Sequence, residues 1–252
     1  MQKLVFVALS GLALSLGATA QDAEGEPEKK WSGEGSLSAG ISTGNTETVD
    51  LGLALNFQRT AGAWKFSAEG SYDYGEVDGL EARNRYFVAG QADRSVGERF
   101  YAFGRVSYEE DDFSGFASRL FAGVGAGYHI FKRENLIWDV EVAPGFRIDE
   151  TADVIDPDTG LVTEPGESIE RVGVRGASRF SYDFNERVGL TNNTGVTSSS
   201  ETTQIQNTIA LDSSLTNALT ARISFEVRHD TNPPTGFEPT DTATRLSIVY
   251  GF

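Results

Sequence analysis

The sequence predicts an all-β fold, an antiparallel transmembrane β-barrel of the outer-membrane type with about 12 strands. Three observations lead to this prediction. Segments that alternate between apolar and polar residues recur along the chain, as expected of strands with one lipid-facing and one lumen-facing side. After Ala20 no apolar run approaches the ~20 residues of a membrane-spanning helix, so strands must do any spanning. The connections between the segments also tend to alternate in length.

Residues 1–20 are expected to be a cleaved signal peptide and are excluded from the fold. Lys3 gives a basic start, an apolar stretch follows, and ATA at 18–20 places small residues where signal peptidase cuts. Residues 21–30 (QDAEGEPEKK) are acidic and poor in apolar residues, which predicts a flexible periplasmic tail. The barrel is then expected to occupy residues 31–252.

The composition excludes several functions. Cysteine is absent, so the chain has no disulfide, thiolate metal site or cysteine nucleophile. The net charge of −16 argues against nucleic acid as a partner and favours solubility during transit through the periplasm. The 28 glycines suit tight turns and a crowded barrel wall.

The first three expected strands, 31–43, 49–57 and 64–74, alternate most clearly. Their polar positions carry Ser, Glu, Asp, Asn and Lys, so one face suits a lumen and the other suits lipid. A tight hairpin turn is expected at Gly44-Asn45. The three apolar faces consist of Trp31, Leu37, Ala39 and Ile41, of Val49, Leu51, Leu53, Leu55 and Phe57, and of Trp64, Phe66, Ala68, Tyr72 and Tyr74.

The next four expected strands are 83–93, 100–110, 120–130 and 136–148. The register of the first two is ambiguous, because apolar residues such as Tyr86 and Phe87 are adjacent. A shift of one residue there would exchange the lipid-facing and lumen-facing side chains. The other two are regular, with inner positions occupied by Arg119, Gly123, Gly125 and Gly127, and by Asp139, Glu141 and Arg147.

The last five expected strands are 172–183, 188–197, 205–215, 219–228 and 246–252. The segment 188–197 is weak and polar, whereas the others alternate. The final strand, LSIVYGF, resembles the C-terminal assembly signal of bacterial outer-membrane barrels, so we expect the barrel-assembly machinery as a partner. We also expect it to pair with 31–43 and close the barrel. Its signal residues are Leu246, Ile248, Tyr250 and Phe252.

The connections support a membrane barrel over a water-soluble β-sandwich, which also alternates faces. If the first strand rises from the periplasm, the periplasmic turns are short and the long connections, 150–169 and 230–240, are extracellular. Only the tight turn at Gly44-Asn45 breaks this trend. Aromatic residues near strand ends match interfacial girdles. We therefore expect a bacterial outer-membrane location, in contact with lipid and lipopolysaccharide.

Charged residues with inward parity are the candidate functional residues. A barrel of this size is wider than one filled by side chains and narrower than a large porin. Interleaved Arg and Asp or Glu could close its lumen as a hydrogen-bonded plug, which we favour, or line a narrow pore. The candidates are Glu69, Arg105, Arg119, Asp139, Glu141, Arg147, Arg175, Arg179, Arg222, Glu226, Arg228 and Arg245.

Two stretches of sequence are similar to a known family. WSGEGSLSAGISTGNTET (31–48) and RFYAFGRVSYEEDDFSGFASRLFAGVGAGYHIF (99–131) resemble the salt-induced outer-membrane protein family, also called domain of unknown function 481. The resemblance implies the outer membrane of a Gram-negative bacterium and, in some members, induction by salt. It implies neither a ligand nor a catalytic mechanism.

The sequence offers little for catalysis or metal binding. An outer-membrane phospholipase needs a Ser–His–Asp or Ser–His–Asn arrangement. His229 lies beside Asp230 but lacks the H-x-S setting of such enzymes, and His129 is expected near a periplasmic turn. The acidic segment 149–170 could collect divalent cations, although a solvated charge run is the simpler interpretation. We therefore expect no enzyme, cofactor or metal, and a structural or narrow-pore barrel with a small-solute channel as the alternative.

Overall fold

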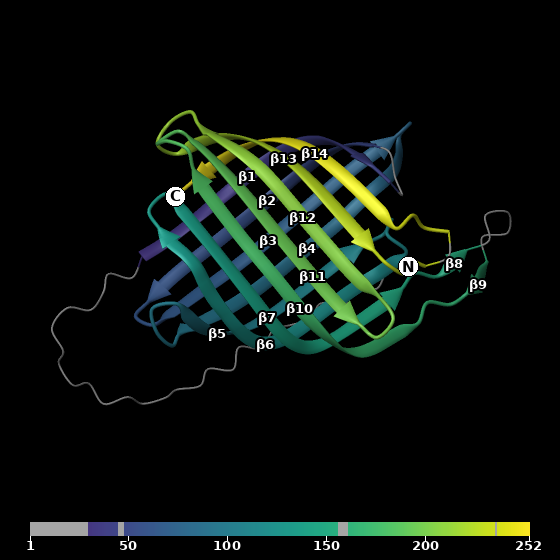
Figure 1. Cartoon of the computed structure of the whole chain (residues 1–252). Helices are drawn as coiled ribbons and strands as arrows, with labels where there is room; N and C mark the ends of the chain where they lie inside the picture. Colours follow the sequence, from purple (N-terminus) through teal and green to yellow (C-terminus); the bar gives the residue numbers. More distant parts are fainter. Residues whose placement is uncertain (1–29, 45–47, 156–160, 235) are drawn as a thin grey trace.

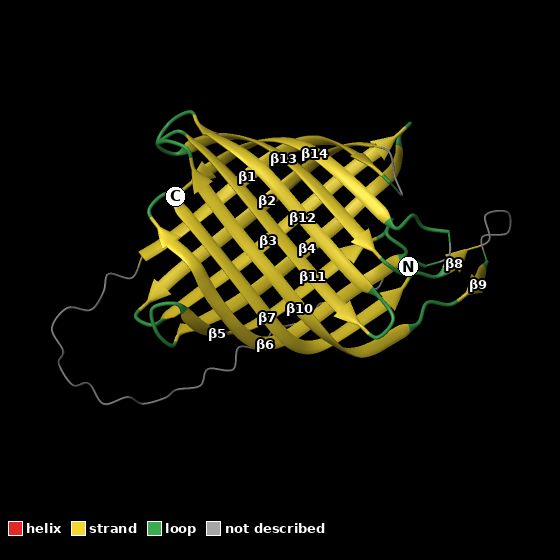
Figure 2. Cartoon of the chain, viewed as in Figure 1, coloured by secondary structure: helices red, strands yellow, loops and turns green. Residues whose placement is uncertain are grey.

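A computed structural model describes residues 30–44, 48–155, 161–234 and 236–252. Twelve long strands form one closed antiparallel barrel, which confirms the predicted fold class (Figures 1 and 2). The predicted signal peptide, and the predicted tail up to residue 29, lie outside the described residues. In the described part of the chain, no helix is long and apolar enough to cross a membrane.

Neighbouring strands of the barrel follow the chain order, except where β10 pairs with β7. The short strands β8 (Val154–Ile155) and β9 (Val162–Glu164) form a separate hairpin within that connection. The barrel strands are β1 (Lys30–Thr43), β2 (Thr48–Ala61), β3 (Trp64–Val77), β4 (Leu80–Ser95), β5 (Phe100–Asp111), β6 (Phe116–Arg133), β7 (Leu136–Thr151), β10 (Ser168–Asp183), β11 (Val188–Ser199), β12 (Thr203–Ser214), β13 (Leu219–Asp230) and β14 (Thr240–Gly251).

The first and last strands close the barrel, as the sequence predicted. β1 and β14 pair from Glu34 opposite Gly251 to Thr43 opposite Thr242. Beyond β14, Phe252 continues the pairing: its carbonyl accepts from Gly33 N at 2.8 Å and its N–H donates to Gly33 O at 2.9 Å. No edge strand is therefore left in the ring, which is what a sheet surrounded by lipid requires.

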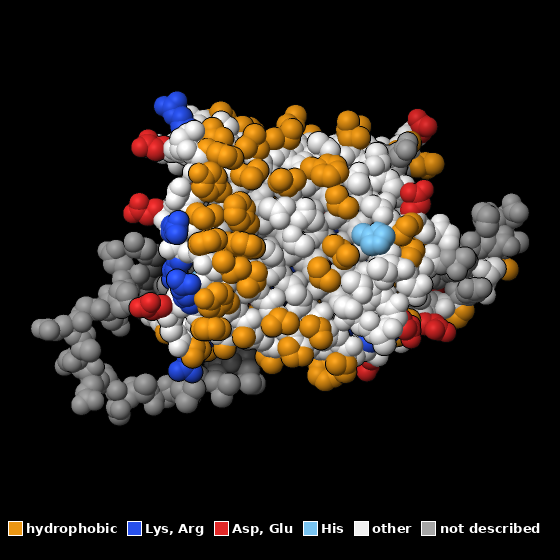
Figure 3. Space-filling view, viewed as in Figure 1, with side chains coloured by type: hydrophobic (Ala, Val, Ile, Leu, Met, Phe, Trp, Pro, Cys, Tyr) orange, Lys and Arg blue, Asp and Glu red, His pale blue; other side chains and the backbone are white. Residues whose placement is uncertain are grey.

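The outer wall of the barrel is apolar. Leu37, Leu53, Val124 and Phe146 are each more than half exposed, as hydrophobic side chains facing lipid would be. Leu246, Ile248, Tyr250 and Phe252 also face outward. In Figure 3 hydrophobic side chains spread over the wall, whereas charged side chains lie at its two ends.

The two ends of the barrel differ in their connections. One end, here called the turn end, carries only the short connections 62–63, 96–99, 134–135, 184–187 and 215–218. The other, the loop end, carries the long connections 152–167 and 231–239. The expectation that only the first hairpin is tight at the loop end is wrong. Asp78 and Gly79 form a two-residue turn with φ of 53° and 78°, an arrangement that suits a twisted hairpin and needs no longer loop.

The structure also assigns the faces of the two ambiguous strands. On β4, Arg83 and Arg85 point inward, and Tyr86 is exposed on the outer wall. On β5, Tyr101 and Phe103 are buried inside with Arg105. Glycines of β6 make room for these inner rings, since a Cβ at Gly127 would overlap the ring of Tyr101. The lumen therefore contains aromatic as well as charged side chains.

Candidate functional site in the barrel lumen

The structure places all twelve charged residues singled out from the sequence inside the barrel. They share the face that the pairing register turns away from the exposed apolar wall. Asp139 lies 2.6 Å from His129 Nδ1, and the other eleven take part in ion pairs with described residues. These eleven are Glu69, Arg105, Arg119, Glu141, Arg147, Arg175, Arg179, Arg222, Glu226, Arg228 and Arg245.

Four of these ion pairs cross the lumen near the loop end. Arg228 on β13 donates to Asp111 at 3.0 Å and to Glu109, both on β5. Five strands separate β13 from β5 in either direction around the ring, so this contact joins opposite walls. Arg119 on β6 donates to Asp230 on β13 at 2.7 Å, and Arg85 on β4 lies 3.9 Å from Glu226 on β13.

Further ion pairs tie these bridges to the barrel wall. Arg245 contacts Glu226 at 2.9 Å, Asp50 at 3.3 Å and Asp73 at 3.3 Å. Arg85 also contacts Asp73 at 3.4 Å and Glu109 at 3.3 Å, so most of these arginines are shared between acids. We call this network the charged layer; it comprises Asp50, Asp73, Arg83, Arg85, Glu109, Asp111, Arg119, Glu226, Arg228, Asp230 and Arg245.

Sequence reasoning had not selected several members of the charged layer. Asp50 and Asp73 lie on strand faces that the sequence analysis had already assigned as polar. Their parity alone was therefore enough to predict that they point into the lumen. Arg83, Arg85 and Glu109 belong to the two strands whose register was ambiguous. Once Arg105 is taken as inward, period-2 alternation along β5 selects Glu109 as well.

The acidic segment 149–170 is described except for residues 156–160, and its first acid is not solvated. β7 continues to Thr151, which turns Asp149 into the lumen, where it is fully buried. Asp149 accepts from Arg147 Nε at 2.7 Å and from Arg171 at 3.4 Å. The first acid of the segment therefore belongs to the wall of the lumen. Within the described residues, no group of three or more His, Asp or Glu side chains is arranged to hold a metal ion.

A second cluster occupies the half of the lumen nearer the turn end. Its centre is Glu141, which accepts from Gln91 at 2.7 Å, from the Tyr101 hydroxyl at 3.0 Å, and from Arg179. Arg175 lies 3.8 Å from the same carboxylate. Arg105 in turn donates to Gln91 at 3.3 Å and pairs with Glu69, which links β3, β4, β5, β7 and β10.

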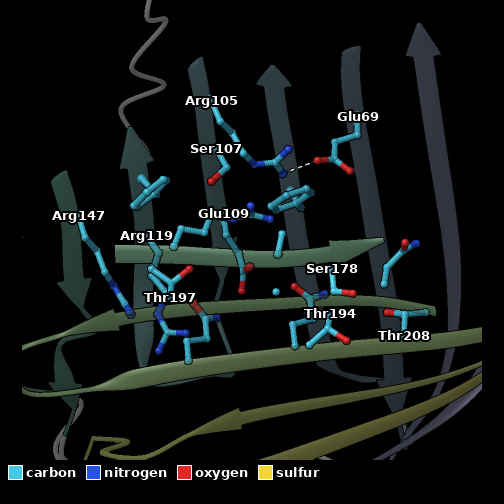
Figure 4. Close-up of a pocket in the computed structure, with 18 of the residues that line it drawn as sticks. Glu69, Arg105, Ser107, Glu109, Arg119, Arg147, Ser178, Thr194, Thr197 and Thr208 are labelled. Carbon is cyan, nitrogen blue, oxygen red and sulfur yellow. Dashed lines mark hydrogen bonds and ion pairs between the residues drawn. The ribbon is translucent and has the colours of Figure 1, made fainter. Parts of the chain in front are cut away.

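Cavities lie beside the charged layer and on its turn-end side. One of about 290 Å³ adjoins the layer, with Glu109 and Arg119 among its lining residues, and extends along β10–β12 (Figure 4). Another of about 450 Å³, lined by Glu34, Lys65 and Asp93, lies nearer the turn end. The two share Glu69, Arg105 and Arg179 as lining residues. On the loop-end side, the space beside Arg228 and Asp230 is only about 30 Å³. The lumen is therefore constricted at the charged layer and hollow along β10–β12 and toward the turn end.

The two histidines do not assemble a hydrolytic site with their neighbours. His129 Nδ1 lies 2.6 Å from Asp139, and its ring packs 4.9 Å from that of Tyr101. His229 Nδ1 lies 2.8 Å from the Thr240 hydroxyl. Asp230, the adjacent acid, instead pairs inside the lumen with Arg119. His229 and Asp230 therefore lie on opposite faces of β13.

A closed antiparallel barrel with an apolar wall and a charged lumen has the architecture of a transmembrane β-barrel. The chain belongs to the family described as "Protein of unknown function, DUF481", whose model matches residues 35–252. A search of curated proteins finds no match.

Solved structures show the same fold at low sequence identity. The NanC porin has a TM-score of 0.55 at 13% identity, over 86% of this chain and 98% of that one. An outer membrane channel from Pseudomonas putida F1 has a TM-score of 0.52 at 10% identity, over 94% of this chain and 100% of that one. The translocator domain of autotransporter NalP from Neisseria meningitidis has a TM-score of 0.50 at 11% identity, over 88% of each chain. At these identities the likeness establishes the fold alone.

Arg228→Gln is expected to lower the free energy of unfolding by about 3 kcal/mol, because it leaves Glu109 and Asp111 without their cross-lumen partner. The matched control is Arg222→Gln, whose pair with Asp212 joins adjacent strands and is partly exposed. That change should cost less than about 1 kcal/mol. Urea unfolding of the refolded barrel in detergent gives both values, and equal costs would contradict a special role for the cross-lumen pair.

Proposed function

We propose that the protein is a non-enzymatic outer-membrane barrel of a Gram-negative bacterium that forms a narrow pore for ions or small solutes. The observation that carries the proposal is the position of the charged layer. It constricts the lumen near the loop end, while a cavity of about 290 Å³ adjoins it and one of about 450 Å³ lies toward the turn end. A blocked constriction next to hollow space fits a gated pore.

The chemistry of the blockage supports a constriction that can rearrange. It consists of Arg and acid side chains carried almost entirely by the barrel strands themselves. Long Arg side chains can exchange between neighbouring carboxylates without disturbing the backbone hydrogen bonds of the wall. The second candidate is a permanently closed structural barrel, favoured by the four ion pairs that cross the lumen.

A double substitution, Arg228→Ser with Glu109→Ser, is expected to raise single-channel conductance several-fold in a planar bilayer. It removes both members of the Arg228–Glu109 pair, so neither of these two side chains remains as a buried charge without the other. The control is Arg222→Ser with Asp212→Ser, which removes a pair between adjacent strands at the turn end. Conductance steps in wild type and control, enlarged only in the first variant, support the pore. Silence from all three proteins supports a structural barrel.

The absence of enzymatic activity is part of the proposal. Its support is the separation of His229 from Asp230 across β13, since a Ser–His–Asp site needs both side chains on one face. His129 is likewise engaged by Asp139 inside the barrel.

We also propose lipid and lipopolysaccharide as the surroundings of the wall, and the barrel-assembly machinery as a partner during insertion. The supporting observation is the outward face of β14 and Phe252, where Leu246, Ile248, Tyr250 and Phe252 are all at least half exposed. Phe252 additionally extends the seam through its two backbone hydrogen bonds with Gly33.

Phe252→Ala is expected to reduce, at least several-fold, the fraction of protein that reaches the outer membrane as a folded barrel. Phe225→Ala is the control, because Phe225 is an outward aromatic on the adjacent β13. Outer-membrane fractions are run on gels with and without boiling, since a folded barrel changes mobility on heating. Equal losses in the two variants would argue against an assembly role for the final residue.

A link to salt stress completes the proposal and depends on the sequence resemblance alone. The protein level is expected to rise when cells are shifted to high NaCl. Quantitative immunoblotting at matched growth rates, with an unrelated outer-membrane barrel as reference, measures this. An unchanged ratio of the two proteins would remove the salt link and leave the pore proposal intact.

A further inference from the structure

We propose that the cavity of about 290 Å³ beside the charged layer is a binding site for a compact, hydroxylated oxyanion. The ligand class is a small solute that carries a carboxylate or phosphate group together with hydroxyl groups. The inference rests on the proposed pore, because the lumen is the path by which such a solute reaches the cavity.

The lining of this cavity is cationic in a chain whose net charge is −16. Nearby acids balance its arginines incompletely. Glu141 is shared by Arg175 and Arg179, and Asp149 is shared by Arg147 and Arg171. The lining combines two glutamates, Glu69 and Glu109, with the five arginines Arg105, Arg119, Arg147, Arg175 and Arg179.

Several of these arginines present buried donors without a hydrogen-bond partner among the described residues. Arg147 is 2% exposed and bonds Asp149 through Nε, whereas both its Nη1 and Nη2 are unpartnered. Arg175 Nη1 is also unpartnered, at 3.8 Å from Glu141. A buried donor left unsatisfied is costly, and a guanidinium binds a carboxylate or phosphate through two parallel hydrogen bonds. An oxyanion in the cavity would satisfy these donors.

The opposite wall of the cavity has a different chemistry. There β11 and β12 contribute only neutral polar side chains to the lining, including Asn193, Thr197, Gln206 and Thr208. Figure 4 shows Thr197 and Thr208 on strands that cross in front of those carrying Arg119 and Arg147. Amides and hydroxyls both donate to and accept from hydroxyl groups. The cavity is at the small end of ligand sites, ~300 Å³, which limits the solute to a compact one.

The test is calorimetric titration of the refolded barrel in detergent with three probes: glucuronate, inorganic phosphate and glucose. Glucuronate is expected to bind and glucose, which lacks the charge, is not. The comparison of phosphate with glucuronate shows which anionic group the site recognises. Binding of phosphate alone identifies a phosphate site, and binding of glucuronate alone identifies a carboxylate site. Binding of neither anion, or of glucose as tightly as glucuronate, overturns the proposal.

Variants locate the site. Arg147→Gln and Arg175→Gln are each expected to weaken anion binding at least tenfold, whereas Arg222→Gln, in the lumen but outside this cavity, should leave it unchanged. Arg147→Lys keeps the positive charge beside Asp149 but lacks the forked donors of a guanidinium. We expect this variant to fold and to bind the anion more weakly than the wild-type protein does. Folding of every variant is verified by its gel shift on heating. Unchanged affinity in both Gln variants overturns the assignment.

The two proposals fail separately. Binding in detergent does not require conduction, so a barrel that binds the anion but is silent in a bilayer loses only the pore proposal. A barrel that conducts but binds no anion loses only the site proposed here.

Discussion

The constraint on which the structure depends is that every backbone N–H and C=O group of a strand in lipid must be paired within the protein. One strand left as an edge would expose a row of unpaired groups to hydrocarbon. The β1–β14 seam removes that edge through ten residue pairs, from Glu34 with Gly251 to Thr43 with Thr242. Closure then divides the side chains of each strand between two environments, and the alternation in the sequence follows from that division.

Closure also explains why so many charges are stable inside. A ring of twelve strands is narrow enough for Arg228 on β13 to reach Asp111 on β5, the strand opposite. Each charge placed inside by parity therefore finds a partner either along the wall or across the lumen. Removal of one partner is costly because the other remains buried, whereas a pair between adjacent strands near the mouth, such as Arg222 with Asp212, keeps access to water.

The lumen is asymmetric along its axis, and this asymmetry is what suggests function. Near the loop end the acids and arginines neutralise one another in the charged layer. Beside this layer, along β7 and β10, the pairing is incomplete: Arg147 and Arg175 belong to the cavity lining and retain buried donors without a partner. A barrel stabilised only as a scaffold has no need of this second region. A pore that selects small anions needs a constriction and a place where the solute is held beside it.

The sequence by itself determined the strand number, the apolar outer face, the closing pair of strands and the inward parity of Glu141 or Arg147, because regular alternation marks these segments. It left β4 and β5 unresolved, since Tyr86 and Phe87 are both apolar and only pairing with neighbours decides which one faces lipid. It also missed Asp149, which longer strands turn inward. The contact between Arg228 and Asp111 joins residues 117 positions apart, and only the tertiary structure could decide it. Alternation in the sequence determines which face of the strand a side chain occupies, whereas closure of the barrel determines which residue lies across the lumen from it.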